Sequence, residues 1–300
     1  MSVPRRIRAR IVKDTVAASR LRIGDTEIAY RVRPTSGGTD ARTILVLHGF
    51  TGQGGDWAAV CDQLAGHGHG SICPDHPGHG DSDAPDDPAL YTMEALAELH
   101  HSLCTHLEGG PVVLLGHSMG AAAAEQFAIR HRDSVEALIL VDSVGGSRKE
   151  DWARALAGYE KPKLRKMAFE QGMGALYDYQ IASGRRLIEH IPEELRADVR
   201  AHFTQTSVVG YFHAAAGMRD RIDTLQALAG FDSPALVLAG ENEDPTFIAG
   251  SRELNACLPN SRFVSIEDAA HNPQFEAPER LADIVLEFLQ ETGPVERRER

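Results

Sequence analysis

The sequence predicts an α/β protein with a mostly parallel sheet, helices on both faces of that sheet, and a helical cap inserted into it. Two observations support this fold class. Short apolar runs alternate with longer helical patterns along the 300 residues, as expected for strand–helix–strand units. One interval between two apolar runs is about 90 residues long, which is too long for a loop between adjacent strands.

The expected strands are short, and the segments between them have a helical pattern. Residues 27–33, EIAYRVR, alternate polar and apolar side chains as an edge hairpin does. Near-continuous apolar runs follow at residues 43–49, 70–75, 111–116, 136–142, 234–240 and 261–268. Helical patterns between and after them include 93–108 and 280–291. Near-continuous apolar strands are typical of a parallel sheet that is buried on both faces.

The long interval is helical in pattern and rich in aromatic residues. We interpret residues 145–230 as a helical cap and assign 1–144 and 231–300 to the core domain. The aromatic residues of the interval are Trp152, Tyr159, Phe169, Tyr177, Tyr179, Phe203, Tyr211 and Phe212. We expect about half of them to form the core of the cap and the rest to line an apolar acyl pocket.

The composition restricts the partners. The formal net charge is −12, which argues against nucleic acid. Basic residues gather at 5–10 and 296–300, and we interpret these segments as solvated tails. No apolar run approaches the roughly 18 residues that a membrane helix needs, so we expect a small-molecule substrate and no membrane partner. The sequence gives no indication of the oligomeric state.

The cysteines indicate a reducing compartment. They are Cys61, Cys73, Cys104 and Cys257. None belongs to a Cys-x-x-Cys pair, so neither a zinc site nor a disulfide framework is indicated. The N-terminal segment is basic but lacks the apolar stretch of a secretory signal. We therefore expect a cytoplasmic protein.

A nucleophile motif lies between an expected strand and an expected helix. In VVLLGHSMGAAAAEQFA, residues 112–128, the apolar run is followed by Gly-His-Ser-Met-Gly and then by an alanine-rich helical pattern. A Gly-x-Ser-x-Gly turn in this context is a nucleophile elbow, which lifts a serine hydroxyl above the sheet edge. Both Gly116 and Gly120 are expected to lie too close to neighbouring backbone for any side chain. We therefore predict Ser118 as the nucleophile.

A serine needs a base to become a nucleophile, and the base needs an acid to orient it. Chain order at such an elbow is serine, acid, histidine. His271, in DAAHNPQFEAPER, follows the last apolar run and precedes the last helical pattern. That position puts it at the same sheet edge as Ser118, and we predict it as the base.

The acid is expected after the preceding strand, in LVLAGENEDPTF. Three carboxylates compete there: Glu241, Glu243 and Asp244. We choose Asp244, because it is the last carboxylate before the proline and because aspartate is the usual orienting group. Glu243 remains an alternative, and Asp142 at the end of an earlier apolar run is a further option.

The chain resembles the α/β-hydrolase fold family in segments that span about residues 25–290. The matching segments are His48-Gly49-Phe50, DHPGHGDSD, GHSMG, GENED and DAAHNPQFE. The resemblance implies an eight-stranded sheet, a Ser-His-acid triad and no cofactor. It also implies an oxyanion hole formed by the backbone N–H groups of Phe50 and Met119. These segments are specific for the fold and the triad but not for the substrate.

Several branches of the family remain as alternatives. The loop HGFTGQGGDW resembles that of the menaquinone-pathway lyases, but these carry an arginine shortly after the elbow where this chain has Ala121 and Ala122. Carbon–carbon bond hydrolases of ring-cleavage products are also similar, but they have an asparagine at the position of His117. Haloalkane dehalogenases and epoxide hydrolases place aspartate at the elbow, so Ser118 excludes their covalent chemistry.

No metal or nucleotide site is expected. Histidines and aspartates gather in two segments, as His67, His69, His76, His79, Asp81 and Asp83. Their spacing fits no standard zinc motif. No Walker loop is present, and no Gly-x-Gly-x-x-Gly follows an expected strand, so no nucleotide cofactor is implied.

The sequence thus predicts a serine hydrolase that cleaves an ester or related acyl bond of a small, largely apolar molecule. Its expected triad is Ser118, His271 and Asp244. The residues expected to contact the substrate are Trp57, Phe50 and His117. The alternatives are a carbon–carbon bond hydrolase or lyase that uses the same triad, or a small-molecule receptor that retains it.

Overall fold

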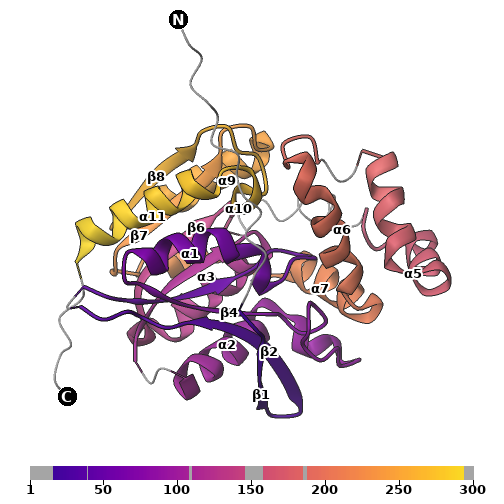
Figure 1. Ribbon diagram of the computed structural model, residues 1–300, viewed down its shortest axis with the longest axis horizontal. Helices are drawn as coiled ribbons and strands as arrows, with labels where there is room; N and C mark the ends of the chain where they lie inside the picture. Colours follow the sequence, from indigo (N-terminus) through magenta and orange to yellow (C-terminus); the bar gives the residue numbers. More distant parts are fainter. Residues whose placement is uncertain (1–15, 39, 108–109, 146–157, 185–187, 294–300) are drawn as a thin grey trace, which may run out of the picture.

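The computed structural model describes residues 16–38, 40–107, 110–145, 158–184 and 188–293. They form an eight-stranded sheet with strand order β1-β2-β4-β3-β5-β6-β7-β8. The strands are β1 Ser19–Ile23, β2 Thr26–Arg33, β3 Thr43–Leu47, β4 Gly70–Pro74, β5 Val112–His117, β6 Val135–Val141, β7 Ala235–Gly240 and β8 Ser261–Ile266. Only the β1–β2 and β2–β4 pairs of this sheet are antiparallel. The expected mostly parallel, eight-stranded sheet is confirmed (Figure 1).

Helices cover both faces of the sheet. The α-helices are α1 Ala58–Gly66, α2 Met93–Leu107, α3 Met119–Arg130, α5 Pro162–Ala182, α6 Arg196–Gln205, α7 Val208–Asp220, α8 Leu225–Leu228, α9 Pro245–Cys257, α10 Pro273–Glu276 and α11 Pro278–Thr292. The short 3-10 helices are η1 Gly54–Trp57, η2 Pro88–Tyr91, η3 Arg132–Ser134 and η4 Glu193–Leu195. Helices α1 and α11 pack on one face, and α2, α3 and α9 pack on the other.

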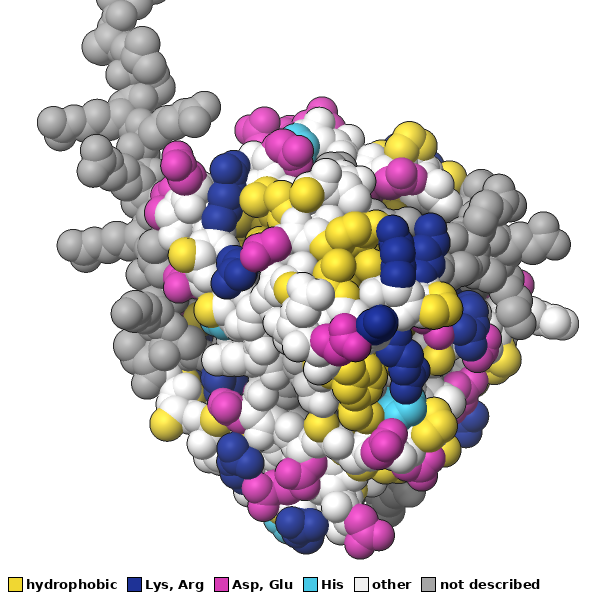
Figure 2. Space-filling model, turned by 90° about the vertical axis from the view of Figure 1, so that its right-hand side faces the viewer, with side chains coloured by type: hydrophobic (Ala, Val, Ile, Leu, Met, Phe, Trp, Pro, Cys, Tyr) yellow, Lys and Arg dark blue, Asp and Glu magenta, His cyan; other side chains and the backbone are white. Residues whose placement is uncertain are grey.

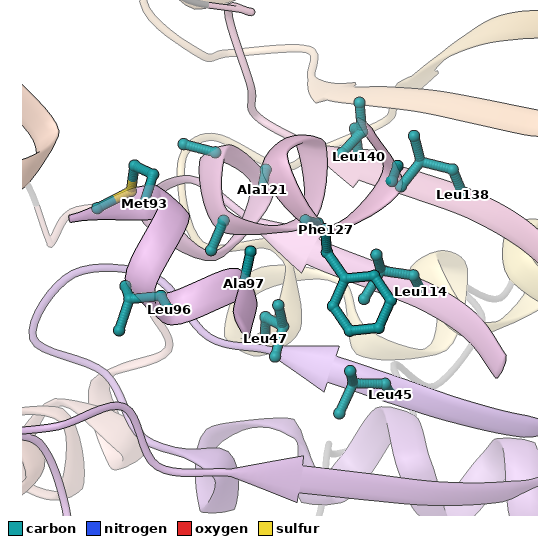
Figure 3. Packing of buried hydrophobic residues seen from close by; sticks show 14 of the residues in the cluster. Leu45, Leu47, Met93, Leu96, Ala97, Leu114, Ala121, Phe127, Leu138 and Leu140 are labelled. Carbon is teal, nitrogen blue, oxygen red and sulfur yellow. The ribbon is translucent and has the colours of Figure 1, made fainter. Parts of the chain in front are cut away.

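The core consists of two apolar layers, one on each side of the sheet. Successive side chains of a strand point to opposite faces. In β3, Leu45 and Leu47 therefore join the cluster under α2 and α3, whereas Ile44 and Val46 join the cluster under α1 and α11. Figure 3 shows the first of these layers, with Phe127 of α3 lying over the strand side chains.

Helix α11 illustrates how the sequence pattern produces the packing. Pro278 stands at its start, where a missing N–H costs nothing. Leu281, Val285 and Phe288 are buried at intervals of three or four residues, which places them on one face of the helix. That face packs against α1 and the sheet.

Helices α5, α6 and α7 lie between β6 and β7, beyond the end of the sheet in Figure 1. They have an apolar cluster of their own, which includes Leu164 and Leu176 of α5. Residues 146–157 of the proposed cap lie outside the described residues. Helix α8, at the end of the segment assigned to the cap, packs against α3 and α9 of the core. The boundary of the cap at residue 230 stays a prediction.

The cap aromatics are used mainly inside the cap. Tyr177, Phe203, Tyr211 and Phe212 are buried and pack with one another. Phe169 is 54% exposed, and Trp152 lies outside the described residues. Four of the eight aromatic residues are therefore buried, as expected, whereas the expectation that the others line an apolar acyl pocket stays a prediction.

The surface around the cap is mixed in charge. Figure 2 looks onto this side and shows basic, acidic and hydrophobic side chains interspersed among the described residues. Within the same residues, no helix combines the length and the hydropathy required to cross a bilayer.

Candidate active site

Ser118 lies in the turn between β5 and α3, with backbone angles φ 52° and ψ −111°. A positive φ is strained for any residue other than glycine and marks functional turns. The flanking glycines permit the turn. A Cβ on Gly116 would lie 2.5 Å from the carbonyl oxygen of Gly120, and a Cβ on Gly120 would collide with the carbonyl of Leu47. Ser118 is partly exposed at the end of a buried strand.

His271 follows β8 and reaches Ser118 across the sheet edge. Its Nε2 lies 3.1 Å from the Ser118 hydroxyl. The loop that carries it packs tightly on β7, because a Cβ on Gly240 would lie 2.7 Å from the carbonyl oxygen of Ala269. The structure thus brings together two residues that lie 153 positions apart in the sequence.

Glu243, not Asp244, is the carboxylate that contacts His271. Its Oε2 accepts a hydrogen bond of 2.5 Å from Nδ1 of His271, and its side chain is 5% exposed. Asp244 is exposed and accepts a hydrogen bond of 2.8 Å from the N–H of Thr246. The choice of Asp244 is therefore corrected to the alternative, Glu243.

The reason for the correction is local. Asp244 is the N-cap of α9, whose first residue is Pro245. Aspartate is a preferred N-cap and proline a preferred first helical residue, so the Asp-Pro pair in the sequence was a helix-start signal. Glu241, the third competing carboxylate, is exposed and lies near the N–H of Asp268 at 3.4 Å.

Asp142 lies behind the same histidine but does not bond to it. It is fully buried, with a positive φ of 50° after β6. Its Oδ1 accepts a hydrogen bond from the N–H of Gly240 at 3.0 Å. Its Oδ2 lies 3.9 Å from Nε2 of His117. Burial, and then the nearby charge of Glu243, hold the pKa of this carboxyl well above its usual range, which favours the neutral form.

The environment of His271 favours a proton on its ring. Burial by itself lowers the pKa of His271. The charge and hydrogen bond of Glu243, together with the charges of Asp142 and Glu276, act in the opposite direction and raise the pKa to about 9. An imidazole that accepts a proton readily is suited to act as a general base toward a hydroxyl.

The resemblance implies the backbone N–H groups of Phe50 and Met119 as the oxyanion hole, and both residues lie in segments next to Ser118. Met119 is the first residue of α3, and the first N–H groups of a helix have no partner within it. Phe50 follows β3, in the loop next to the elbow. Gly49, the residue before Phe50, packs closely on Ser118: a Cβ on Gly49 would lie 3.4 Å from the Cβ of Ser118.

Buried histidines hold the loop of Phe50, an arrangement that no motif in the sequence indicates. His48 Nδ1 donates to the carbonyl oxygen of Gly49 at 2.8 Å, and His76 Nε2 donates to the carbonyl oxygen of His48 at 2.9 Å. His76 Nδ1 in turn accepts from Nε2 of His100 at 2.7 Å. Because Gly49 O belongs to the same peptide as the Phe50 N–H, this chain fixes the orientation of that donor. Burial lowers the pKa of all three histidines, so they remain neutral.

A small cavity of about 30 Å³ is lined by His117, the residue before Ser118, and by Gly49 and Phe50. The lining includes all three residues expected to contact a substrate, Trp57, Phe50 and His117. It also includes two residues that the sequence did not single out, Gln274 of α10 and His202 of α6. The cavity therefore lies between the core and the cap.

His202 connects the cap to the core at this cavity. Its Nδ1 lies 2.6 Å from Oδ1 of Asp56 in η1. Burial lowers the pKa of His202, but the hydrogen bond and charge of Asp56 outweigh burial and raise it. A larger hollow of about 690 Å³ shares Asp56, His202, Gln274 and Phe275 with the small cavity.

One group of side chains could in principle hold a metal ion. Ligand atoms of His117, Asp142 and His271 lie within 4.8 Å of one another. Two of these side chains are already engaged, because Nε2 of His117 donates to the carbonyl oxygen of His271 at 2.7 Å and His271 bonds to Glu243. The segments with His67, His69 and Asp81 do not join such a group among the described residues.

The sheet order, the elbow and the Ser–His–Glu chain together define a class of protein. Residues 42–278 match the model of the alpha/beta hydrolase fold family, and the chain belongs to that family. It is an enzyme of the hydrolase type.

Individual relatives differ in their reactions. The chain is 28% identical over 260 residues to a putative 2-succinyl-6-hydroxy-2,4-cyclohexadiene-1-carboxylate synthase of Bacillus subtilis (strain 168), covering 83% of this chain and 90% of the relative. It resembles the structure of a thermophilic esterase from Thermogutta terrifontis, with TM-score 0.73, 28% identity, and coverage of 92% and 99%. It also resembles an enol-lactonase from Burkholderia xenovorans LB400, with TM-score 0.75, 26% identity, and coverage of 91% and 100%.

Proposed function

We propose that this enzyme is a serine hydrolase that cleaves an ester or related acyl bond of a small molecule through an acyl-enzyme. The observation that carries the proposal is the hydrogen-bonded chain from Ser118 through His271 to Glu243. It has the order of nucleophile, base and orienting acid. The esterase and the enol-lactonase among the similar structures support the same reaction type.

The proposed reaction begins with attack by Ser118. Its Oγ adds to the carbonyl carbon of the ester, and its proton moves to Nε2 of His271. Collapse of the tetrahedral intermediate breaks the bond to the leaving alcohol, which takes that proton from His271. Water then attacks the acyl-enzyme with His271 as the base, which releases the carboxylic acid and restores Ser118.

The remaining groups stabilise charge as it forms. The N–H groups of Phe50 and Met119 are proposed to bind the oxyanion of the tetrahedral intermediate, and one such donor contributes about 10²–10³ in rate. Glu243 keeps the proton of His271 on Nδ1, so that Nε2 faces the serine. It also balances the imidazolium charge that develops during attack.

The nature of the substrate is proposed from the lining next to Ser118. The sequence favoured an apolar molecule, but the described cap aromatics pack mainly against one another. The small cavity instead brings Trp57, His117 and Gln274 together with Phe50. We keep Trp57, Phe50 and His117 as substrate contacts and favour a compact substrate with polar groups.

Carbon–carbon bond cleavage or a lyase reaction by the same triad is the second candidate, and the synthase-named relative favours it. The positions after the elbow, Ala121 and Ala122, bear no cation for a substrate carboxylate. A receptor that retains the triad is a third candidate.

A turnover assay separates the candidates. Purified enzyme is incubated with short p-nitrophenyl esters and, in parallel, with a dienone ring-cleavage product, using Ser118→Ala as the control for each. The proposal expects many turnovers of an ester that are lost in Ser118→Ala. Turnover of the dienone alone would support carbon–carbon cleavage, and a single turnover at most would support a receptor.

A further inference from the structure

His100 is a polar residue on the apolar stripe of helix α2. The buried positions of this helix are Met93, Leu96, Ala97, His100, Leu103 and Cys104, and their spacing puts them on the face toward the core. The side chain of His100 is fully buried, and its Nδ1 has no hydrogen-bond partner among the described residues. A buried unpaired polar atom destabilises a fold, so packing alone does not account for a histidine at this position.

The other ring nitrogen of His100 connects α2 to the loop after β3. Nε2 of His100 lies 2.7 Å from Nδ1 of His76. Nε2 of His76 lies 2.9 Å from the carbonyl oxygen of His48, and the backbone N–H of His76 donates to Nε2 of His48 at 2.9 Å. We call these three fully buried rings the histidine chain. His48 stands two residues before Phe50, whose N–H is a proposed oxyanion donor.

The directions of these hydrogen bonds are fixed by backbone groups. The carbonyl oxygen of His48 can only accept, so Nε2 of His76 carries the proton, its Nδ1 accepts, and Nε2 of His100 donates. The N–H of His76 can only donate, so Nε2 of His48 accepts and Nδ1 of His48 donates to the carbonyl oxygen of Gly49. Burial lowers the pKa of all three rings, which keeps them in these neutral tautomers.

The histidine chain ends on the peptide group between Gly49 and Phe50, which we call the oxyanion peptide. The carbonyl oxygen of Gly49 accepts from His48 at 2.8 Å and from the N–H of Gly52 at 3.1 Å, which uses both of its lone pairs. Because a peptide group is planar and trans, a fixed carbonyl also fixes the direction of the N–H of Phe50. That N–H has no acceptor in the part of the chain that the structure describes, as expected for a donor that binds an oxyanion during the reaction.

We propose that His100 is a positioning residue: through His76 and His48 it holds the oxyanion peptide in the orientation that stabilises the tetrahedral intermediate. The inference rests on the proposed ester hydrolysis, with the N–H of Phe50 as an oxyanion donor. His100 lines neither the small cavity nor the larger hollow, so its effect passes through the two other histidines. The effect should therefore be smaller than the loss of about 10²–10³ in rate that follows removal of an oxyanion donor.

Two substitutions separate the hydrogen bond of His100 from the space that its ring fills. The amide nitrogen of glutamine can take the place of Nε2, so His100→Gln keeps a donor for His76, whereas His100→Met has a similar length and no donor. We expect kcat and kcat/KM for a p-nitrophenyl ester to fall about equally in His100→Met, by about tenfold or more. A small misplacement of a reacting group is costly, and an interaction made only in the transition state affects both constants alike. His100→Gln should recover most of this loss.

The adjacent residue of α2 provides a matched control. His101 is partly exposed and bonds to the hydroxyl of Ser134, so His101→Met should keep the wild-type kcat. Titration of Ser118 with a fluorophosphonate counts the intact sites in each variant. If His100→Met does not fold, His100→Asn replaces it, because the shorter amide does not reach the position of Nε2.

Two further measurements respond to the oxyanion hole and to the tautomers rather than to stability. An alkyl trifluoromethyl ketone adds to Ser118 as a hemiketal whose oxygen resembles the oxyanion. Its inhibition constant should rise in His100→Met by about the factor by which kcat/KM falls. In the wild type, nitrogen NMR of ¹⁵N-histidine-labelled enzyme should show the protons of His76 and His100 on Nε2 and that of His48 on Nδ1.

The outcomes separate this inference from the function on which it depends. A wild-type rate in His100→Met, an equal loss in His100→Gln, or a loss confined to KM would overturn the role of His100 while ester hydrolysis stands. A proton on Nδ1 of His76 in the wild type would overturn it as well. If the wild type turns over no ester and Ser118 takes up no fluorophosphonate, the proposed function itself fails.

Discussion

Glu243→Gln and Asp244→Asn make a sharp comparison, because the two residues are neighbours with different environments. Glu243 is buried and bonds to Nδ1 of His271 at 2.5 Å, whereas Asp244 is exposed and caps α9. Glutamine has nearly the shape of glutamate but no charge. In a triad with aspartate, the corresponding amide substitution lowers kcat by about 10⁴, since the histidine takes the wrong tautomer.

We expect Glu243→Gln to lower kcat/KM by about 10²–10⁴. The lower limit allows for Asp142, one of whose oxygens lies within 4.8 Å of a ring nitrogen of His271. Besides burial, the charge of Glu243 raises the pKa of Asp142, so in Glu243→Gln the Asp142 carboxyl ionises more readily and can supply part of the missing charge. Asp244→Asn should change kcat/KM less than about twofold. Asparagine caps a helix about as well as aspartate, so the stability should also be unchanged.

The pH profile provides a second readout that a merely structural effect would not produce. The base must be unprotonated in the free enzyme, so kcat/KM should rise with pH toward the His271 pKa of about 9. Loss of the Glu243 charge removes the largest influence that raises this pKa. In Glu243→Gln the rise should therefore move to lower pH, while Asp244→Asn keeps the wild-type profile.

Initial rates with a p-nitrophenyl ester from pH 5 to 10 measure both effects. The reasoning fails if Asp244→Asn is the more damaging variant, or if Glu243→Gln keeps both the wild-type rate and the wild-type profile. A strong further loss in the double variant Glu243→Gln/Asp142→Asn, relative to Glu243→Gln, would show that Asp142 compensates.

Three further outcomes are expected. Asp142→Asn alone should change kcat/KM by less than about threefold in the same assay, because burial already favours the neutral form of this carboxyl; a loss of about 10⁴ would instead make it the triad acid. Gly120→Ala should lower the free energy of unfolding in urea by about 1–3 kcal/mol or more, since the added Cβ meets the backbone of Leu47. The pKa of His202 is raised by Asp56, so the stability that this pair contributes is complete below about pH 6.5 and is lost as pH rises through the folded-state pKa. The melting temperatures of wild type and His202→Gln should therefore differ more at pH 5.5 than at pH 9, and a difference independent of pH would contradict this assignment.

The elbow could be predicted because its requirements are local. A buried strand, two obligatory glycines and a helix all occur within residues 112–128. His271 could be predicted from topology, since a loop after the last strand of a parallel sheet reaches the same edge as Ser118. Both arguments depend only on the order of elements along the chain.

The acid could not be chosen by the same reasoning. Glu241, Glu243 and Asp244 lie within four positions, and the direction of each side chain depends on the turn after β7. Glu243 is buried there while the other two point to solvent. The Asp-Pro pair was available as a cap signal, and it would have removed Asp244 from the choice.

The cavity and the hydrogen-bonded chain of histidines could not be predicted from the sequence, for a different reason. Trp57, His117 and Gln274 lie in segments more than 50 residues apart, and only the folded chain brings these residues to one cavity. His48, His76 and His100 likewise come from a strand end, a loop and a helix. No local pattern encodes such groups, because their partners are set by the tertiary packing.

Covalent labelling of Ser118 tests the central claim most directly. The enzyme is treated with a fluorophosphonate, and the adduct is measured by intact mass and located by peptide mass spectrometry. The Ser–His–Glu chain predicts one adduct per chain, on Ser118, with labelling abolished in Ser118→Ala and slowed by at least about 10²-fold in Glu243→Gln. An unlabelled wild-type enzyme, or an adduct on another residue that persists in Ser118→Ala, would contradict it.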